Sequence, residues 1–499
     1  MKVFDIIIIG SGLGGLESAL ILSREGYSVC VLEQHNQIGG CLQNFTRDNC
    51  VFDTGIHYIG SLDDGQVLNQ YFRYFGLMNK IKLKRMDSEA FDIVNFANDP
   101  VEYGYAMGHE NFIRKMMEYF PHEKDALINY ISKMKQICDH FPLYNLSNKS
   151  LHLNELEFFR DNIDVYLKEI TKNQKLQKVL AGTNSLYAGI PGKTPLYVHA
   201  LVNNSFIESS WRVVDGSSQI ADVLAGQIID NGGTIQTSAK AEKFIFNNKN
   251  LTAVKLANGE IIEARYFISS IHPAITISMI DEQYLRNVYR QRINNLENTT
   301  SNFTLYVVFK PESFEYLNHN LYYFKGDDVW MSEKKADSNW PENFLLITPA
   351  SSHHEKYACN ATIMAYMNIA DVREWENTAV GKRGQDYLEY KQQKTEQVLD
   401  AVEHRFPGFR QTIKKVYSSS PLTYRDYTGT KDGSLYGILK DCNDPLKTLI
   451  SPRTKIPNLF LTGQNIILHG VLGVTIGAVT TCSELLGIEY LTEKIKSSS

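Results

Sequence analysis

The sequence predicts an α/β fold: a Rossmann-like, doubly wound parallel sheet with an inserted domain of mixed α and β structure. The chain opens with an apolar run, a glycine-rich turn, a helical pattern and a second apolar run. A short apolar run and another glycine-rich turn return near the C-terminus, followed by a second helical pattern. We therefore expect one sheet assembled from distant parts of the chain.

The N-terminal segment is predicted to be a strand–helix–strand unit. Residues 3–9 form an apolar run without alternation, which is typical of a strand buried on both faces. Residues 16–24 have helical spacing, Gly26 ends this helix, and residues 27–32 form a second buried strand. The right-handed crossover of such a unit makes it the core of a doubly wound sheet.

The remaining elements follow from the same patterns. Amphipathic helical patterns dominate residues 69–204. Asn258-Gly259 predicts a hairpin turn between two strands. The other helices are expected at 111–119, 124–139, 219–230, 385–403 and 473–486, and the other strands at 234–246, 253–256, 261–269, 303–309 and 458–462.

Composition narrows the class of protein. Of the 499 residues, 43% are hydrophobic and 21% charged, values of an ordinary globular protein. The 51 Lys and Arg against 56 Asp and Glu give a net charge of -5, which argues against a nucleic-acid-binding protein. The seven cysteines form no C-x-x-C pair, so we expect neither disulfides nor a metal site. The adjacent His353 and His354 point apart and make a poor metal pair.

Location follows from the absence of targeting signals. The apolar run at 4–10 is short and lacks the features of an export signal, and 466–479 is too short to span a membrane. We expect a cytoplasmic protein; peripheral contact with a membrane stays open.

A glycine-rich turn directly after the first strand predicts a dinucleotide site. It matches G-x-G-x-x-G, whose glycines allow a tight turn, close approach to a pyrophosphate and close helix–strand packing. Glu33 ends the second strand, where a carboxylate can accept hydrogen bonds from ribose hydroxyls and repel the 2′-phosphate of NADP. The motif residues are Gly10, Ser11, Gly12, Leu13, Gly14 and Gly15.

Two further glycine-rich segments favour a larger cofactor than NAD. Gly39 and Gly40 would let the chain pass close under a second cofactor portion, although an ordinary glycine-rich connection is the alternative. Near the C-terminus, a strand enters Gly463, Gln464 and Asn465 before a helix that begins near Gly473 and Val474. A helix N-terminus there would stabilise negative charge on a reduced flavin; the alternative is a closely packed buried helix.

The sequence then resembles a known family. GSGLGGLESA, E-x5-GG, FDTGIHYIG, VVDGSSQIADVLAGQI, SPLTYRDYTGT and LFLTGQNIILHGVLGVTIGA together resemble the phytoene desaturases, carotenoid cis–trans isomerases and retinol saturases, and most closely the all-trans-retinol 13,14-reductase branch. The resemblance spans nearly the whole chain. It implies FAD, a domain like that of the flavin amine oxidases, and a lipophilic tunnel at the isoalloxazine ring.

The resemblance also implies residue roles. Gly10, Gly12, Gly15 and Glu33 would hold the ADP half, and the backbone of Ala241 would meet adenine. Residues 40–42 would lie near the ribityl chain and pyrophosphate. The C-terminal glycine segment would meet the flavin. The expected cofactor set also includes Gln34, Cys41 and Leu42; Cys41 departs from the arginine or tyrosine common in the family, and we predict no covalent flavin bond there.

The same resemblance suggests a division into domains. Residues 1–68, 205–275 and 415–499 would form a discontinuous FAD-binding domain. Residues 69–204 and 276–414 would form a substrate-binding domain with a helical lid.

Reduction of a polyene double bond needs a hydride, a proton and a dry pocket. The catalytic candidates are His57, Tyr58, Tyr424, Asp426 and His469, because Tyr and His can donate protons when their surroundings tune them. Alternatives are weighed beside them: His57 can hydrogen-bond a loop carbonyl, and Asp426 can form an ion pair with Arg425. His469 is favoured as a flavin contact.

The expected function is therefore an FAD-dependent oxidoreductase acting on carbon–carbon double bonds of a polyene lipid, most like a retinol saturase. A desaturase or a redox-neutral isomerase is the alternative, since the sequence does not encode the direction of hydrogen transfer. No second G-x-G-x-x-G marks an NADPH domain. The electron donor is left open between a carrier protein and a transiently bound NADH or NADPH.

Overall fold

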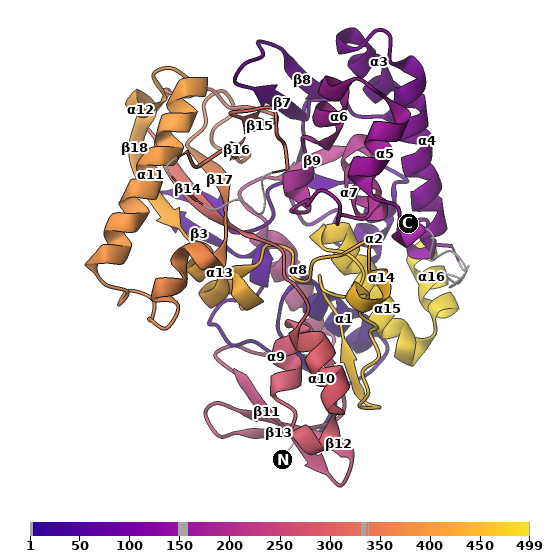
Figure 1. Ribbon diagram of the computed structural model, residues 1–499. Helices are drawn as coiled ribbons and strands as arrows, with labels where there is room; N and C mark the ends of the chain where they lie inside the picture. The colour runs from indigo at the N-terminus through magenta and orange to yellow at the C-terminus, as the bar shows by residue number, and fades with distance from the viewer. Residues whose placement is uncertain (1–2, 148–157, 331–335, 338, 499) are drawn as a thin grey trace.

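The protein is described here from a computed structural model that covers residues 3–147, 158–330, 336, 337 and 339–498. The structure contains two large sheets (Figure 1). One group of helices packs on the sheet that contains the N-terminal strand, and another group lies beside the second sheet. The C-terminal helices lie against the first helix of the chain, so the two ends of the sequence meet in one domain (Figure 1).

The first sheet has the order β10-β2-β1-β13-β12-β11, with β19 paired to β13. Its parallel core comes from four distant segments, which confirms the sheet assembled from separated parts of the chain. Strand β1 is buried almost completely, as expected for a strand covered on both faces. The strands are β1 (Phe4–Ile9), β2 (Val29–Leu32), β10 (Thr234–Gln236), β11 (Ala241–Asn247), β12 (Asn250–Leu256), β13 (Ile261–Ser269) and β19 (Leu459–Leu461).

Helices α1 (Leu13–Arg24), α8 (Ser218–Asp230) and α15 (Gly470–Leu486) pack beside one another on this sheet. Both α1 and α15 begin earlier than predicted, because the glycine-rich turns enter the helices directly. The strand predicted over 234–246 is wrong as a single element: β10 pairs with β2, whereas β11 forms an antiparallel hairpin with β12.

The second sheet is mixed and has the order β18-β14-β17-β16-β15-β7-β8. Strands β7 and β8 come from the segment where helical patterns dominate; β8 is an edge strand, and β7 pairs in parallel with β15. The α/β fold with an added mixed domain is therefore confirmed. The strands are β7 (Asp92–Phe96), β8 (Glu102–Tyr105), β14 (Ser301–Phe309), β15 (Asn320–Phe324), β16 (Asn343–Ile347), β17 (Asn360–Met367) and β18 (Ile413–Ser419).

Helices cover both parts of the molecule. Five helices gather at the top of the N-terminal part, and α11 (Gln385–Arg405) packs on the second sheet through Val398 and Val402 (Figure 1). Among the described residues, no helix combines the length and apolar character needed to cross a membrane. The five are α3 (His109–Tyr119), α4 (Lys124–His140), α5 (Ile163–Ile170), α6 (Gln174–Ala181) and α7 (Leu196–Glu208).

Several smaller elements complete the fold. A three-stranded sheet joins β5 (Ile59–Gly60), β9 (Ser210–Val213) and β6 (Leu83–Arg85), and β3 (Asn44–Arg47) pairs with β4 (Cys50–Asp53). The remaining helices with a role here are the 3-10 turns η1 (Gly40–Leu42) and η4 (Asn184–Leu186), and the α-helices α13 (Pro421–Thr428) and α16 (Ile488–Ser497).

Candidate functional site

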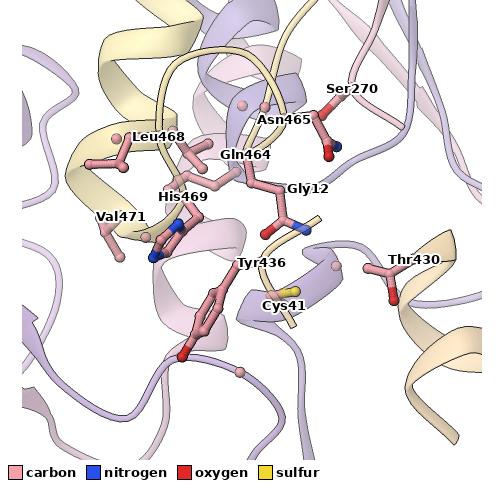
Figure 2. Close-up of a pocket in the computed structure, with 18 of the residues that line it drawn as sticks. Gly12, Cys41, Ser270, Thr430, Tyr436, Gln464, Asn465, Leu468, His469 and Val471 are labelled. Atoms are coloured by element: carbon pink, nitrogen blue, oxygen red, sulfur yellow. The ribbon is translucent and has the colours of Figure 1, made fainter. Parts of the chain in front are cut away.

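One cavity of about 1240 Å³ joins the three glycine-rich segments to the interior of the molecule. It runs from the turn after β1 and the strand end at Ala241, past Gly463, to an apolar end among the helices. Every predicted cofactor residue lines it except Gly15, and so do all five catalytic candidates. The structure thus brings together residues from both ends of the chain (Figure 2).

The glycines after β1 are required by close backbone approach. Gly10 has φ +94°, and a Cβ on Gly15 would lie 2.1 Å from the carbonyl oxygen of Gly10. A Cβ on Gly14 would lie 3.0 Å from Cα of Gly463, so α1 and the C-terminal turn touch here. A Cβ on Gly12 would meet nothing closer than 3.9 Å within the protein, so this face of the turn is open to a ligand.

Glu33 is held by the glycine turn itself. Its Oε2 accepts hydrogen bonds from the Ser11 backbone N–H at 3.1 Å and the Ser11 hydroxyl at 2.5 Å. Its Oε1 accepts from the His35 N–H at 2.9 Å. The carboxylate is buried beside the cavity in a fixed orientation, which is the position needed to accept from a ribose.

The second glycine pair brings η1 against the first turn. Gly39 and Gly40 both have positive φ, and a Cβ on Gly40 would lie 3.2 Å from Cα of Gly12. Cys41 follows and faces the cavity (Figure 2). Burial raises the pKa of the Cys41 thiol to about 11, so it is protonated and weakly nucleophilic at neutral pH.

The C-terminal turn is supported from behind by a lysine that sequence reasoning missed. Lys440 is buried, and its ammonium donates to the carbonyls of Asn465 and Ile466, each at 3.2 Å, and of Thr448 at 3.1 Å. Burial lowers the pKa of Lys440 to about 7. A lone lysine in a polar stretch gives no sequence signal, because its partners are backbone carbonyls.

His469 lies at the start of α15 and stacks on a tyrosine that sequence reasoning also missed. Its ring centroid lies 4.3 Å from that of Tyr436, and its Nε2 lies 2.9 Å from the carbonyl oxygen of Leu186. Because a carbonyl only accepts, Nε2 carries the proton. Burial lowers the pKa of His469 to about 4, so the ring is neutral. Figure 2 shows both rings facing the space that Gln464 and Cys41 also border.

The two neighbouring candidates in the 55–60 loop differ in their surroundings. His57 lines the cavity, and its imidazole makes no hydrogen bond within the described residues, so the expected bond to a loop carbonyl is absent. Burial lowers the pKa of His57 to about 4. The Tyr58 hydroxyl instead donates to Oδ2 of Asp92 at 2.9 Å and lies 2.7 Å from the Tyr322 hydroxyl. Burial raises the pKa of Asp92 to about 7.

The candidates on α13 are engaged with the protein. The Tyr424 hydroxyl lies 2.9 Å from Oγ1 of Thr304, and burial keeps its pKa well above the usual range. Asp426 forms ion pairs with Arg383 and with Arg425. The geometry supports the ion-pair alternative for Asp426.

The inner end of the cavity is apolar and aromatic. Its walls come from α7, from the segment after α4 and from β16 and β17. Such a surface holds a hydrophobic ligand and excludes water. No individual residue here was predicted, because tertiary packing selects them from many buried aromatic residues. They include Phe141, Leu143, Tyr144, Phe159, Tyr197, Leu201, Val202, Phe206, Leu345, Ile347 and Met364.

Fold and site define a Rossmann-type protein whose cavity suits a flavin or dinucleotide cofactor. The profile of the family described as NAD(P)-binding Rossmann-like domain matches residues 8–75. The fold matches that of putrescine oxidase with bound putrescine (TM-score 0.63, 14% identity, 97% of this chain and 99% of that one). It also matches cyclohexylamine oxidase from Brevibacterium oxydans (TM-score 0.62, 14% identity, 99% and 100%).

The chain is similar over its whole length to particular enzymes. All-trans-retinol 13,14-reductase of Rattus norvegicus is 27% identical over 97% of this chain and 85% of that protein. The 4,4′-diaponeurosporene oxygenase of Staphylococcus aureus is 22% identical over 87% and 88%. This distant, full-length similarity to retinol reductases and carotenoid-modifying enzymes agrees with the resemblance of the sequence motifs.

Proposed function

We propose that this protein is an FAD-dependent oxidoreductase acting on carbon–carbon double bonds of a polyene lipid, most like an all-trans-retinol 13,14-reductase. The observation that carries the proposal is one continuous cavity, which joins the glycine-rich turn after β1 to an apolar, aromatic end. The similarity to retinol 13,14-reductases supports the substrate class.

The residues present fit FAD. A Cβ on Gly14 or Gly40 would lie within 3.2 Å of backbone, so the three glycine segments pack against one another, and the open face of Gly12 borders the cavity. Gly10, Gly12 and Glu33 would hold the ADP half, with Ala241 beside adenine. The neighbouring Leu13 and Gln34 border the same space. The flavin portion would lie along Leu42, Gly463, Gln464, Asn465, Gly473 and Val474.

When bound, FAD supplies the hydride chemistry of the reaction. The chain supplies the dry walls, the orientation of the alkene and a proton. Tyr58 is the proposed proton donor, because it lines the cavity and its hydroxyl is hydrogen-bonded to Asp92 and Tyr322, a group that can return the proton. Burial and the neighbouring Asp92 raise the pKa of Tyr58 well above the usual range, as burial does for Tyr424. Asp92, with its pKa raised to about 7 by burial, holds that replacement proton near neutrality.

The other candidates have different proposed roles. His57 and His469 are neutral, and His469 holds its proton on the Leu186 carbonyl, so both orient ligands more readily than they protonate them. Tyr424 keeps its proton and contacts the cavity. Asp426 anchors α13 through its two arginines.

The proposed domain division follows the two sheets. Residues 1–68, 205–275 and 415–499 carry the cofactor, and 69–204 with 276–414 carry the lipid, with the helices around α4 and α7 as the lid. Strand β18 crosses this division, since it pairs with β14. Transient NADH or NADPH and a carrier protein are the two proposed sources of electrons. Peripheral membrane contact is proposed as the route of the lipid.

The first experiment identifies the cofactor and then the direction of the reaction. Purified protein is heated, the released cofactor is identified, and the flavin-loaded enzyme is given a panel of polyenes with several electron donors, with and without oxygen. A product two hydrogens heavier supports the saturase, two lighter the desaturase, and an unchanged mass the isomerase. A colourless protein that takes up no flavin, or a flavoprotein that converts no polyene with any donor, contradicts the proposal. NAD without flavin would indicate a nicotinamide dehydrogenase.

A further inference from the structure

Two cysteines that lie 309 residues apart in the sequence meet beside the second sheet. Cys50 begins β4, and Cys359 directly precedes β17. The thiol of Cys50 donates to the backbone carbonyl of Cys359 at 3.4 Å. Next to this contact, Nδ2 of Asn360 donates to the carbonyl of Val51 at 2.7 Å. These two bonds hold β4 against the start of β17 and bring the two cysteine side chains together.

The two thiols also contact each other. A hydrogen bond from the Cys359 thiol lowers the pKa of Cys50, because a thiolate at Cys50 accepts this bond. The ammonium group of Lys414 lowers the same pKa, whereas partial burial and the Asp48 carboxylate raise it. The contact raises the pKa of Cys359 in turn. Cys50 is therefore the thiol of the pair that ionises first.

Other cysteines of the chain are in less reactive surroundings. Burial raises the pKa of four of them, and a thiol with a raised pKa is rarely a thiolate at neutral pH. These four are Cys41, Cys138, Cys442 and Cys482.

The pair lies just beneath the surface. Cys359 is half-buried, and residues 352–356 of the loop before it are exposed. Cys50 is 6% exposed and follows the exposed Asn49 in the turn between β3 and β4. A small oxidant such as hydrogen peroxide can approach a thiol in this position. An acidic thiol with a second thiol beside it is the arrangement that peroxide oxidises to a disulfide.

We propose that Cys50 and Cys359 form a reversible disulfide, driven by hydrogen peroxide, that joins β4 to β17. In the first step the Cys50 thiolate attacks one peroxide oxygen and the O–O bond breaks. Cys50 becomes a sulfenic acid, and the second oxygen leaves as water with the proton that the thiol lost. In the second step the Cys359 sulfur attacks the Cys50 sulfur, and the hydroxyl leaves as water with the Cys359 proton. The two thiols lose two electrons, and the peroxide takes up both.

The disulfide would cross-link the two parts of the molecule. Asp53, at the end of β4, accepts hydrogen bonds from the N–H and the hydroxyl of Ser217, both at 2.7 Å, so β4 is attached to the start of α8. Strand β17 lies inside the second sheet, between β14 and β16. A bond that closes so long a loop restricts the unfolded chain, and we expect it to raise the melting temperature by about 2–5 °C. The inference is independent of the cofactor and of the substrate.

The test uses the full chain as purified. The protein is reduced with dithiothreitol, freed of the reductant and treated with an excess of hydrogen peroxide. The remaining thiols are then alkylated, the mass of the chain is measured, and peptides are mapped without reduction. We expect two of the seven thiols to escape alkylation and one linked pair of peptides, which contains Cys50 and Cys359. Dithiothreitol should restore all seven thiols and the lower melting temperature.

Three variants separate the two steps. In Cys359→Ser the reaction should stop at the Cys50 sulfenic acid, which dimedone traps as an adduct, and Cys50→Ser should give neither the adduct at this site nor the bond. Cys442→Ser is the matched control, because Cys442 is also buried and its thiol contacts a backbone carbonyl, that of Gly192 at 3.8 Å. This variant should form the same disulfide as the wild type.

The mapping of the wild-type protein decides the outcome even where a variant fails to fold. A wild-type chain that keeps all seven thiols under peroxide overturns the proposal. A disulfide that involves a different cysteine overturns it as well, and so does oxidation of Cys50 to a sulfinic acid without any bond to Cys359.

Discussion

Asp92→Asn gives the sharpest test of the buried group behind Tyr58. The Asp92 carboxyl accepts from the Tyr58 hydroxyl at 2.9 Å and from Nδ2 of Asn320 at 2.7 Å. Complete burial raises its pKa from 3.8 to about 7. Asparagine has the same shape and can keep both contacts, with its oxygen toward Asn320 and its amide nitrogen donating to the Tyr58 oxygen.

The expected effect depends on pH with a definite sign. Because the folded pKa is raised, the stability that Asp92 contributes is fully present below pH 3.8 and is lost as pH rises through about 7. Between pH 5 and pH 8 the wild type loses the free energy of two pH units, about 2.7 kcal/mol at about 1.36 kcal/mol per unit. Asp92→Asn does not titrate, so it avoids this loss.

The size of the temperature shift follows from chain length. With an unfolding entropy of about 2.1 cal/mol/K per residue, a chain of 499 residues changes its melting temperature by about 1 °C per kcal/mol. The difference in melting temperature between Asp92→Asn and wild type should therefore rise by about 2.5 °C from pH 5 to pH 8, measured by scanning calorimetry. Asp230→Asn, at the exposed end of α8, is the control. A difference that is the same at both pH values refutes the reasoning.

Three further predictions concern the cofactor and the proton. Gly12→Ala should fold normally, because the added Cβ meets no protein atom within 3.4 Å. Its affinity for FAD, measured by absorbance titration, should be at least about tenfold lower than that of the wild type. A wild-type flavin content in the variant contradicts this prediction. Cys41→Ser should leave the flavin absorption spectrum unchanged, and heat should release the cofactor from the wild type and the variant alike. Flavin that stays attached to the denatured wild-type chain would show a covalent bond and refute this prediction. Tyr58→Phe should keep its flavin, but the rate of polyene reduction in a single turnover should fall about 10²-fold and the pH profile of that rate should change. Tyr424→Phe should lower the rate less. Equal effects of the two substitutions would argue against Tyr58 as the proton donor.

Local sequence patterns predicted those elements whose burial is the same along their whole length. Strand β1 and the glycine-rich turn at 10–15 could be predicted from the sequence. A strand that is buried on both faces requires apolar residues, and a turn that excludes side chains requires glycine. The break between β10 and β11 leaves no such trace. It is fixed by hydrogen bonds from the N–H groups of Ser238 and Ala239 to the carbonyls of His35 and Glu33, which lie far away in the sequence.

The same distinction applies to the site. The glycines that border the cavity could be found, because close approach of one backbone segment to another excludes a side chain. Lys440 could not, because its role comes from backbone carbonyls that only the folded chain brings near it. Tyr436 belongs to the same group, since its contact with His469 joins two loops. The residues at the apolar end of the cavity are set by packing, and many sequences satisfy packing equally well.

A buried carboxyl between the two N-terminal helix ends shows how the distant segments act together. Helices α1 and α15 both begin at the cavity, so their positive dipole ends are directed toward it. Glu17 lies between them and accepts a hydrogen bond from the Thr475 hydroxyl at 2.8 Å, while its other oxygen has no partner among the described residues. Complete burial raises the pKa of Glu17 well above its usual range, which favours the neutral form. An ionised carboxylate here would cancel much of the positive potential of both helix ends, whereas a neutral one joins the helices and leaves that potential directed at the cavity.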